Sequence, residues 1–110
     1  MPLVTVLTDV PAVAEKAEEV CLLVHNAVKE GLGKPDQFIT VSVSKSECIT
    51  VGGTKASVVV EVDSIGGDLN SIIGKISEGL KTYEVDPSKV VGTFRAVSRP
   101  EFAMNGRALG

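Results

Sequence analysis

The chain has 110 residues, 44% of them hydrophobic, and a formal net charge of -3. That length suits a single domain with one modest core. No stretch gathers four basic residues, so nothing in the sequence favours a nucleic acid or an anionic membrane surface as partner. The N-terminus lacks the charged region and apolar run of a signal peptide, and no apolar run approaches the ~20 residues of a membrane span. We therefore expect a cytoplasmic protein.

The first element predicted is a strand near the N-terminus. The chain opens with MPLVTVLTDVP, in which every residue from Leu3 to Leu7 is apolar except Thr5. A helix follows over 12–31, where apolar residues recur at intervals of three and four between charged ones. Gly31 and Gly33 are taken to mark its end.

The second half of the chain repeats the first. PDQFITVSV at 35–43 and PSKVVGTFRAV at 87–97 each start at a proline after a helical segment and run into a strand. The two prolines are 52 residues apart. That offset predicts a further strand over 55–59 and a second helix over 64–83.

The second predicted helix contains Gly74 and Gly79, each of which costs about 1 kcal/mol relative to alanine. Tertiary packing must therefore hold it. Its apolar stripe comprises Leu69, Ile72, Ile73, Ile76, Leu80 and Tyr83.

The pattern predicts one α+β domain over 1–110, built from two pseudo-symmetric β-α-β units of about 2–51 and 54–100. The four strands form a mixed sheet with both helices on one face. The strand residues that face the helices are uniformly apolar: Val4, Val6, Ile39, Val41, Val43, Val58, Val60 and Val62.

The other face of the predicted sheet is mixed in character. Leu3, Leu7, Phe38 and Val59 lie on it among polar residues. This apolar content favours cover by another subunit. The alternative is a solvated face with scattered apolar residues, which is common in proteins.

The two cysteines predict neither a disulfide nor a metal site, because Cys21 and Cys48 match no CxxC or zinc spacing. Cys21 is expected in the core. The single histidine, His25, has no partner at ligand spacing, and we expect it at the surface or boundary of the first helix.

Four motifs carry a family resemblance over the whole chain: MPLVTVLTDVP at the start, GKP at 33–35 followed by Phe38, SIGG at 64–67 opening the second helix, and FAMNG at 102–106. In this order and spacing they resemble the macrophage migration inhibitory factor and D-dopachrome tautomerase family. The resemblance implies a homotrimer with a pocket at each subunit boundary.

The resemblance also implies a catalytic role for Pro2. Family members lose the initiator methionine, and the exposed proline nitrogen moves a proton between oxygen and the carbon next to a carbonyl. Such a base works best with a pKa near the operating pH, which desolvation and a nearby cation favour for an amine. The alternative is a proline that merely begins a strand, where its missing N–H is not needed.

Further site residues follow from the same resemblance. Lys34 would hold a substrate oxygen or carboxylate; alternatively it is a cation placed after a helix end. Ser64 and Ile65 precede the second helix, where the Ile65 N–H would bind an enolate oxygen. An ordinary turn into a helix would also need Gly66 and Gly67. The residues alone therefore leave open whether this segment binds substrate or only makes a turn.

The pocket walls depart from the family pattern. Phe38 replaces a frequent tyrosine and Met104 a frequent tryptophan, while Phe102 keeps the closing C-terminal segment apolar. Val91 stands where better-known members carry a tyrosine that reaches the neighbouring subunit's pocket, and Thr93 replaces an asparagine. KASV at 55–58 occupies the stretch where some members carry a CxxC, so redox activity is not expected.

Three arginines, Arg95, Arg99 and Arg107, lie near the C-terminus. They could pair with Glu101 or bind anions, although solvated surface charges are the usual case.

Three functions are compatible with the sequence. The first is a cofactor-independent keto-enol tautomerase, an isomerase of phenylpyruvate-type 2-oxo acids. The second is a signalling or protein-interaction protein of the same fold, with a protein receptor and, as in the family, non-classical secretion. The absent tyrosine at Val91 favours it. The third is a small-molecule-binding regulatory domain, since fold does not fix function.

Overall fold

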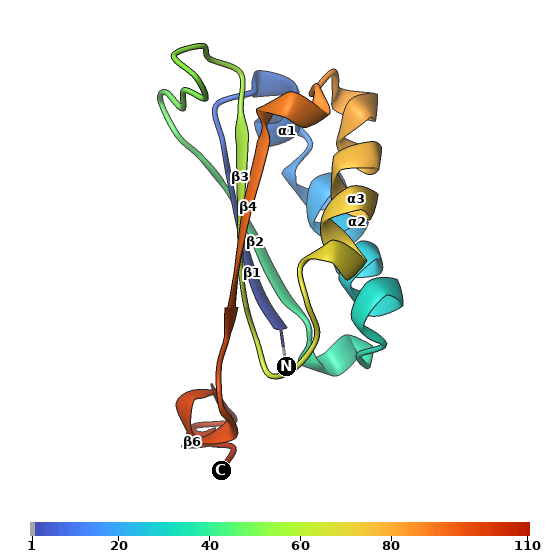
Figure 1. Ribbon diagram of the computed structural model, residues 1–110, viewed down its shortest axis with the longest axis vertical. Coiled ribbons are helices and arrows are strands. Elements are labelled where there is room, and N and C mark those ends of the chain that lie inside the picture. The colour runs from blue at the N-terminus through green and yellow to red at the C-terminus, as the bar shows by residue number, and fades with distance from the viewer. Residues whose placement is uncertain (1) are drawn as a thin grey trace.

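A computed structural model describes residues 2–110 as one four-stranded sheet covered by helices. The strands are β1 (Pro2–Thr8), β2 (Thr40–Lys45), β3 (Val58–Ser64) and β4 (Val90–Ala96), in the order β2-β1-β3-β4. The central pair is antiparallel and the two outer pairs are parallel. Helices α2 (Ala17–Leu32) and α3 (Asn70–Leu80) cover one face (Figure 1). The predicted mixed sheet with helices on one face is confirmed.

Short elements complete the chain. Helix α1 (Pro11–Glu15) follows β1, and 3-10 turns η1 (Asp36–Phe38) and η3 (Pro87–Lys89) precede β2 and β4. Turn η2 (Lys81–Tyr83) extends α3. At the C-terminal end, turn η4 (Arg99–Glu101) leads to a small hairpin of β5 (Ala103–Met104) and β6 (Arg107–Ala108), which projects beyond the sheet in Figure 1.

The core lies between the sheet and the helices. Alternation along β1 and β3 places Val4, Val6, Val58, Val60 and Val62 toward the helices, each at most 1% exposed. The facing helix residues are also fully buried: Val20, Val24, Val28, Ile72, Ile76 and Leu80. Ile39, Val41 and Val43 pack against this core but remain partly exposed, because β2 is an edge strand.

The first predicted helix is interrupted. Lys16 leaves the helical region with φ -106°, which separates α1 from α2. Gly33 ends α2 with φ 64°, and its N–H donates to the Lys29 carbonyl at 2.9 Å. Gly31, expected to mark the same end, instead lies inside α2 against α3.

The bounds of two elements in the second unit also differ from the prediction. Strand β3 covers 58–64 and not 55–59, because the preceding loop makes a separate bridge between Val51 and Thr54 and is held by Asp9. Gly66 and Gly67 have φ 78° and 87°, so SIGG forms a loop and α3 begins only at Asn70.

Three side chains lie elsewhere than predicted. Phe38 belongs to η1 and Tyr83 to η2, so neither is in the strand or helix expected for it. Cys21 is half-buried, with its Sγ 3.8 Å from the Val41 carbonyl oxygen, and does not belong to the core. Within residues 2–110, no helix combines the length and apolar character needed to cross a membrane.

Candidate functional site

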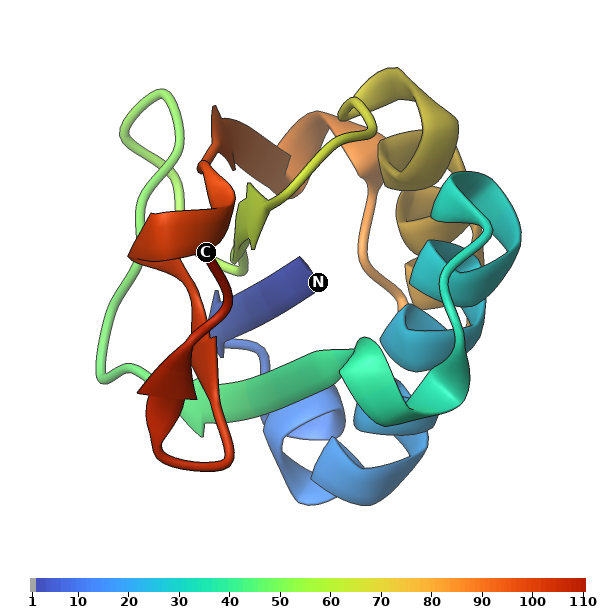
Figure 2. The same cartoon turned by 90° about the horizontal axis from the view of Figure 1, so that it is seen from below.

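One end of the sheet collects the residues singled out from the sequence. Pro2 begins β1 and lies opposite Ser64, the last residue of β3. The connection from α2 to β2 brings Lys34 to this end, and the connection from β3 to α3 brings Ile65 (Figures 1 and 2). Segments more than 30 residues apart along the chain thus meet, because β1 lies between β2 and β3 in the sheet.

Lys34 links two of these connections. Its Nζ donates to the Ile65 carbonyl oxygen at 3.2 Å, a contact that is partly buried. The half-buried side chain forms no ion pair with any residue in the 2–110 range. The side chain thus reaches a neighbouring loop instead of the carbonyls that end α2.

A hollow of about 330 Å³ opens beside this lysine. We call it the Lys34 hollow; it is lined by Lys34, Pro35, Phe38, Ile65, Arg99 and Leu109. Its volume is at the small end of ligand pockets, and most of its lining residues are apolar. It contains two cationic side chains and no carboxylate.

Pro2 and Ser64 are buried, and neither is among the residues that line the Lys34 hollow. The Ser64 hydroxyl donates to the Gly66 carbonyl at 2.8 Å, which stabilises the turn that follows β3. Ser64 thus helps to shape the loop that carries Ile65, and its contact with substrate stays a prediction. Met1, whose removal the Pro2 chemistry requires, lies outside the described residues.

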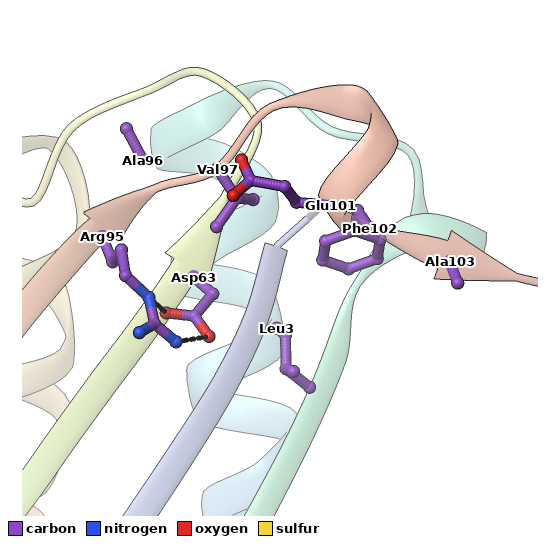
Figure 3. Close-up of a pocket in the computed structure, with 8 residues that line it drawn as sticks. All are labelled: Leu3, Asp63, Arg95, Ala96, Val97, Glu101, Phe102 and Ala103. Carbon is purple, nitrogen blue, oxygen red and sulfur yellow. Dashed lines mark hydrogen bonds and ion pairs between the residues drawn. The ribbon is translucent and has the colours of Figure 1, made fainter. Parts of the chain in front are cut away.

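The two C-terminal wall residues line different hollows. Met104 borders a hollow of about 530 Å³ that shares Phe38 and Leu109 with the Lys34 hollow. Phe102 borders another of about 450 Å³ on the open face of the sheet, with Leu3, Asp63 and Arg95 (Figure 3). A single chain thus brings Lys34, Phe38 and Ile65 together, with Met104 adjacent and Phe102 apart.

Among residues 2–110, none of the three arginines forms an ion pair with Glu101. Arg95 instead forms two hydrogen bonds, of 3.0 and 2.9 Å, with the carboxylate of Asp63 on the neighbouring strand (Figure 3). These bonds raise the pKa of Arg95. Glu101 accepts from the hydroxyl and backbone N–H of Ser98, and these bonds lower its pKa.

His25 lies within α2 and is half-buried, between core and surface as predicted, and its side chain has a partner. Its Nε2 is 2.7 Å from one carboxylate oxygen of Asp36, while Lys29 donates to the other at 3.0 Å. His25 and Lys29 together lower the pKa of Asp36. This cluster attaches α2 to η1, the turn that presents Phe38.

Two lining residues of the Lys34 hollow carried little or no signal in the sequence. Arg99 was one of three arginines without an assigned partner, and Leu109 belongs to no motif. Arg99 Nη2 donates to the Leu109 carbonyl at 3.0 Å, so each holds the other in place. No group of three or more potential metal ligands occurs among residues 2–110.

The site can be compared with known proteins. The family model described as "Macrophage migration inhibitory factor (MIF)" matches residues 1–110. No curated protein matches the chain.

Among solved structures, that of macrophage migration inhibitory factor from Toxoplasma gondii is 24% identical, with a TM-score of 0.86 over 96% of this chain and 97% of that one. Pt0534 inactivated by 2-oxo-3-pentynoate is 21% identical (TM-score 0.83; 97% and 94% covered). A fused 4-OT described as a symmetric trimer is 18% identical (TM-score 0.79; 97% and 94% covered). At these identities the structures establish the shared fold, and the match of the family model along the full length shows that the chain belongs to the macrophage migration inhibitory factor family.

Proposed function

We propose that the chain is a cofactor-independent keto-enol tautomerase of small 2-oxo acids, with the amine of Pro2 as general base. The observation that carries the proposal is the meeting of Pro2, Lys34 and Ile65 at one end of the sheet, where Lys34 forms no ion pair within residues 2–110. Family membership and the relative inactivated by a 2-oxo acid support it.

The physical case for Pro2 rests on its surroundings. An α-amino group titrates close to neutral pH, so its free base is available to abstract a carbon-bound proton. Pro2 is buried and fixed at the start of a central strand, which restricts the direction of its nitrogen. Burial disfavours the ammonium form and so favours the reactive amine.

The other two groups would stabilise the substrate. Lys34 would bind the carboxylate next to the carbonyl, as a compact point charge suited to anions. The backbone N–H of Ile65 would donate to the oxygen that gains negative charge in the enolate. Because Ile65 lies in a loop and not at a helix start, this donor would act without help from a helix dipole.

We extend the proposal to a homotrimer in which a second subunit completes the pocket. The Phe102 side chain lines a hollow on the open sheet face and not the Lys34 hollow, which leaves it available to a neighbour. The relative described as a symmetric trimer supports this assembly.

Insertion of one alanine between Met1 and Pro2 tests the mechanism. It turns the amine of Pro2 into an amide while leaving the strand intact. We expect the parent chain, with loss of Met1 verified by intact mass, to catalyse deuterium exchange at the carbon next to the carbonyl of 2-oxo acids, with kcat/KM rising through an ionisation near neutral pH. The inserted variant should be inactive. Exchange that persisted in a folded variant carrying the extra residue would refute the role of Pro2.

A signalling or protein-interaction role is the second candidate. It is favoured by Val91, an aliphatic side chain 40% exposed on the open sheet face, where other family members carry a tyrosine. The same exchange experiment separates the two, because a vestigial pocket predicts no turnover by the parent chain.

A further inference from the structure

Arg99 places a second positive charge on the Lys34 hollow. Its side chain and that of Lys34 both line this cavity, although the two residues come from opposite ends of the chain. The other lining residues are Pro35, Phe38, Ile65 and Leu109, none of which carries a side-chain charge. The cavity therefore presents two cations on otherwise apolar walls.

Neither cation is neutralised by the protein. The ion pairs among residues 2–110 include neither Lys34 nor Arg99. The acidic residue nearest to Arg99 in sequence, Glu101, accepts hydrogen bonds from Ser98 and lines a different hollow. Asp36, next to Pro35, is engaged by His25 and Lys29. The positive charge of the cavity is therefore available to a ligand.

Arg99 is also held in position. One of its Nη atoms donates to the Leu109 carbonyl at 3.0 Å, and the Leu109 N–H in turn donates to the Phe102 carbonyl at 2.9 Å. A guanidinium has five N–H donors, so most remain free to bind a carboxylate in a fork. Fixing the group in advance lowers the entropy lost when a ligand binds.

We propose that Arg99 makes this site selective for short-chain 2-oxo dicarboxylates, with the carboxylate next to the carbonyl bound by Lys34 and the distal carboxylate bound by Arg99. That these dicarboxylates are substrates rests on the proposed function, whereas their preferred binding does not. A monocarboxylate would leave one of the two cations without a counter-charge, whereas a dicarboxylate compensates both. The apolar walls suit a short aliphatic chain between the two acid groups, and the volume of about 330 Å³ is at the small end of ligand pockets.

Binding of substrate fragments tests the preference without requiring turnover. Glutarate and butyrate serve as the dicarboxylate and monocarboxylate probes, titrated by calorimetry or NMR against the whole protein. We expect the wild type to bind glutarate about 10- to 100-fold more tightly than butyrate, the range for a lost charge-assisted contact. Arg99→Gln should remove most of this ratio, and Arg99→Lys should retain part of it.

Lys75→Gln provides a matched control, because it removes one positive charge from the exposed surface of α3. It should leave the ratio unchanged. The inference would be overturned if the wild type bound both probes equally, or if Arg99→Gln kept the wild-type affinity ratio. The comparison of the two probes on the wild type decides the question even if a variant fails to fold.

The catalytic arm compares deuterium exchange of 2-oxoglutarate and 2-oxobutyrate. A preference of kcat/KM for 2-oxoglutarate that Arg99→Gln abolishes supports the inference, and an equal loss for both substrates contradicts it. Absence of exchange with either substrate would refute the proposed function alone, because the binding ratio would still test Arg99.

Discussion

Lys34 shows how a position directly after a helix can fix where a side chain lies. Gly33 turns the chain out of α2 with a positive φ, and Pro35 fixes the backbone beyond the lysine at φ -65°. The side chain between them reaches the Ile65 carbonyl and so stays at the cavity. A lysine elsewhere on the surface of α2 would have the same charge but no such constraint.

Replacement of Lys34 by alanine should weaken carboxylate binding by about 1 to 3 kcal/mol, because a charge-assisted contact is lost. The Kd of a short 2-oxo acid, measured by calorimetry, checks this. Lys16→Ala removes a lysine whose side chain is 61% exposed and should leave the Kd unchanged. Equal binding by the Lys34→Ala variant and the wild type would exclude Lys34 from the site.

At the scale of elements, the close contact between α2 and α3 depends on Gly31 and not on Gly74. A Cβ on Gly31 would collide with the Ser71 carbonyl oxygen and lie 2.7 Å from Ile72 Cγ2. A Cβ on Gly74 would meet nothing within 4 Å. Gly31 thus permits close approach of the helices, while Gly74 only weakens α3.

Alanine at these two positions should have opposite effects on the free energy of unfolding. Gly31→Ala should lower it by about 1 to 3 kcal/mol through overpacking against backbone. Gly74→Ala should raise it by about 0.5 to 1 kcal/mol through helix propensity. Urea denaturation monitored by circular dichroism measures both, and a Gly31→Ala variant as stable as the wild type would show that the helices can separate at little cost.

The loop between β2 and β3 is anchored by one carboxylate. Asp9 accepts from the backbone N–H groups of Ile49 and Ser57 at 2.9 and 2.8 Å, and from that of Ala56 at 3.5 Å. These bonds, led by that of Ile49, lower the pKa of Asp9 below its ordinary value of 3.8. Lys89 holds the tip of the loop through the carbonyls of Val51 and Thr54.

This anchor should give the loop an acid-sensitive stability. The pKa of Asp9 is lower in the folded chain than in the unfolded one. The stabilisation that its carboxylate contributes is therefore complete at pH values above the ordinary pKa, and it is lost as the pH falls through the pKa of the folded chain. Asp9→Asn should therefore destabilise the protein at neutral pH and flatten the decline of stability below pH 3.8. Unfolding curves across this range, with proteolysis of residues 46–57 as a local probe, measure the effect; an unchanged acid decline would contradict it.

The sequence predicted the layers of this fold but not all of its boundaries. Alternating valines and helical periodicity identified the buried faces of β1, β3, α2 and α3, because burial imposes a strict period on side chains. Phe38 and the SIGG loop were misplaced because a proline or glycine signals a break without giving its length. The cavity role of Leu109 left no trace, since contacts between distant segments have no local signature.

At the scale of the molecule, the chain has features that a monomer would leave unsatisfied. Leu3 and Val91 are 39% and 40% exposed on the open sheet face. Strands β2 and β4 are the edges of the sheet. The unpaired backbone groups of an edge strand favour association with another chain. The β5–β6 hairpin projects from one end of an elongated body of 42 × 23 × 23 Å.

A closed threefold assembly would cover these features together, because heterologous contacts form a ring when the rotation closes. Light scattering coupled to size exclusion should therefore report three times the 11.5 kDa chain mass at micromolar concentration. Leu3→Glu should shift the protein toward monomer, since the new carboxylate would lie opposite Asp63 on the face to be covered. Asn26→Glu adds the same charge on α2, on the helical side, and should leave the trimer intact. A wild-type monomer would show that the open face is solvated in this protein. Equal behaviour of the two variants would show that Leu3 does not lie at the interface.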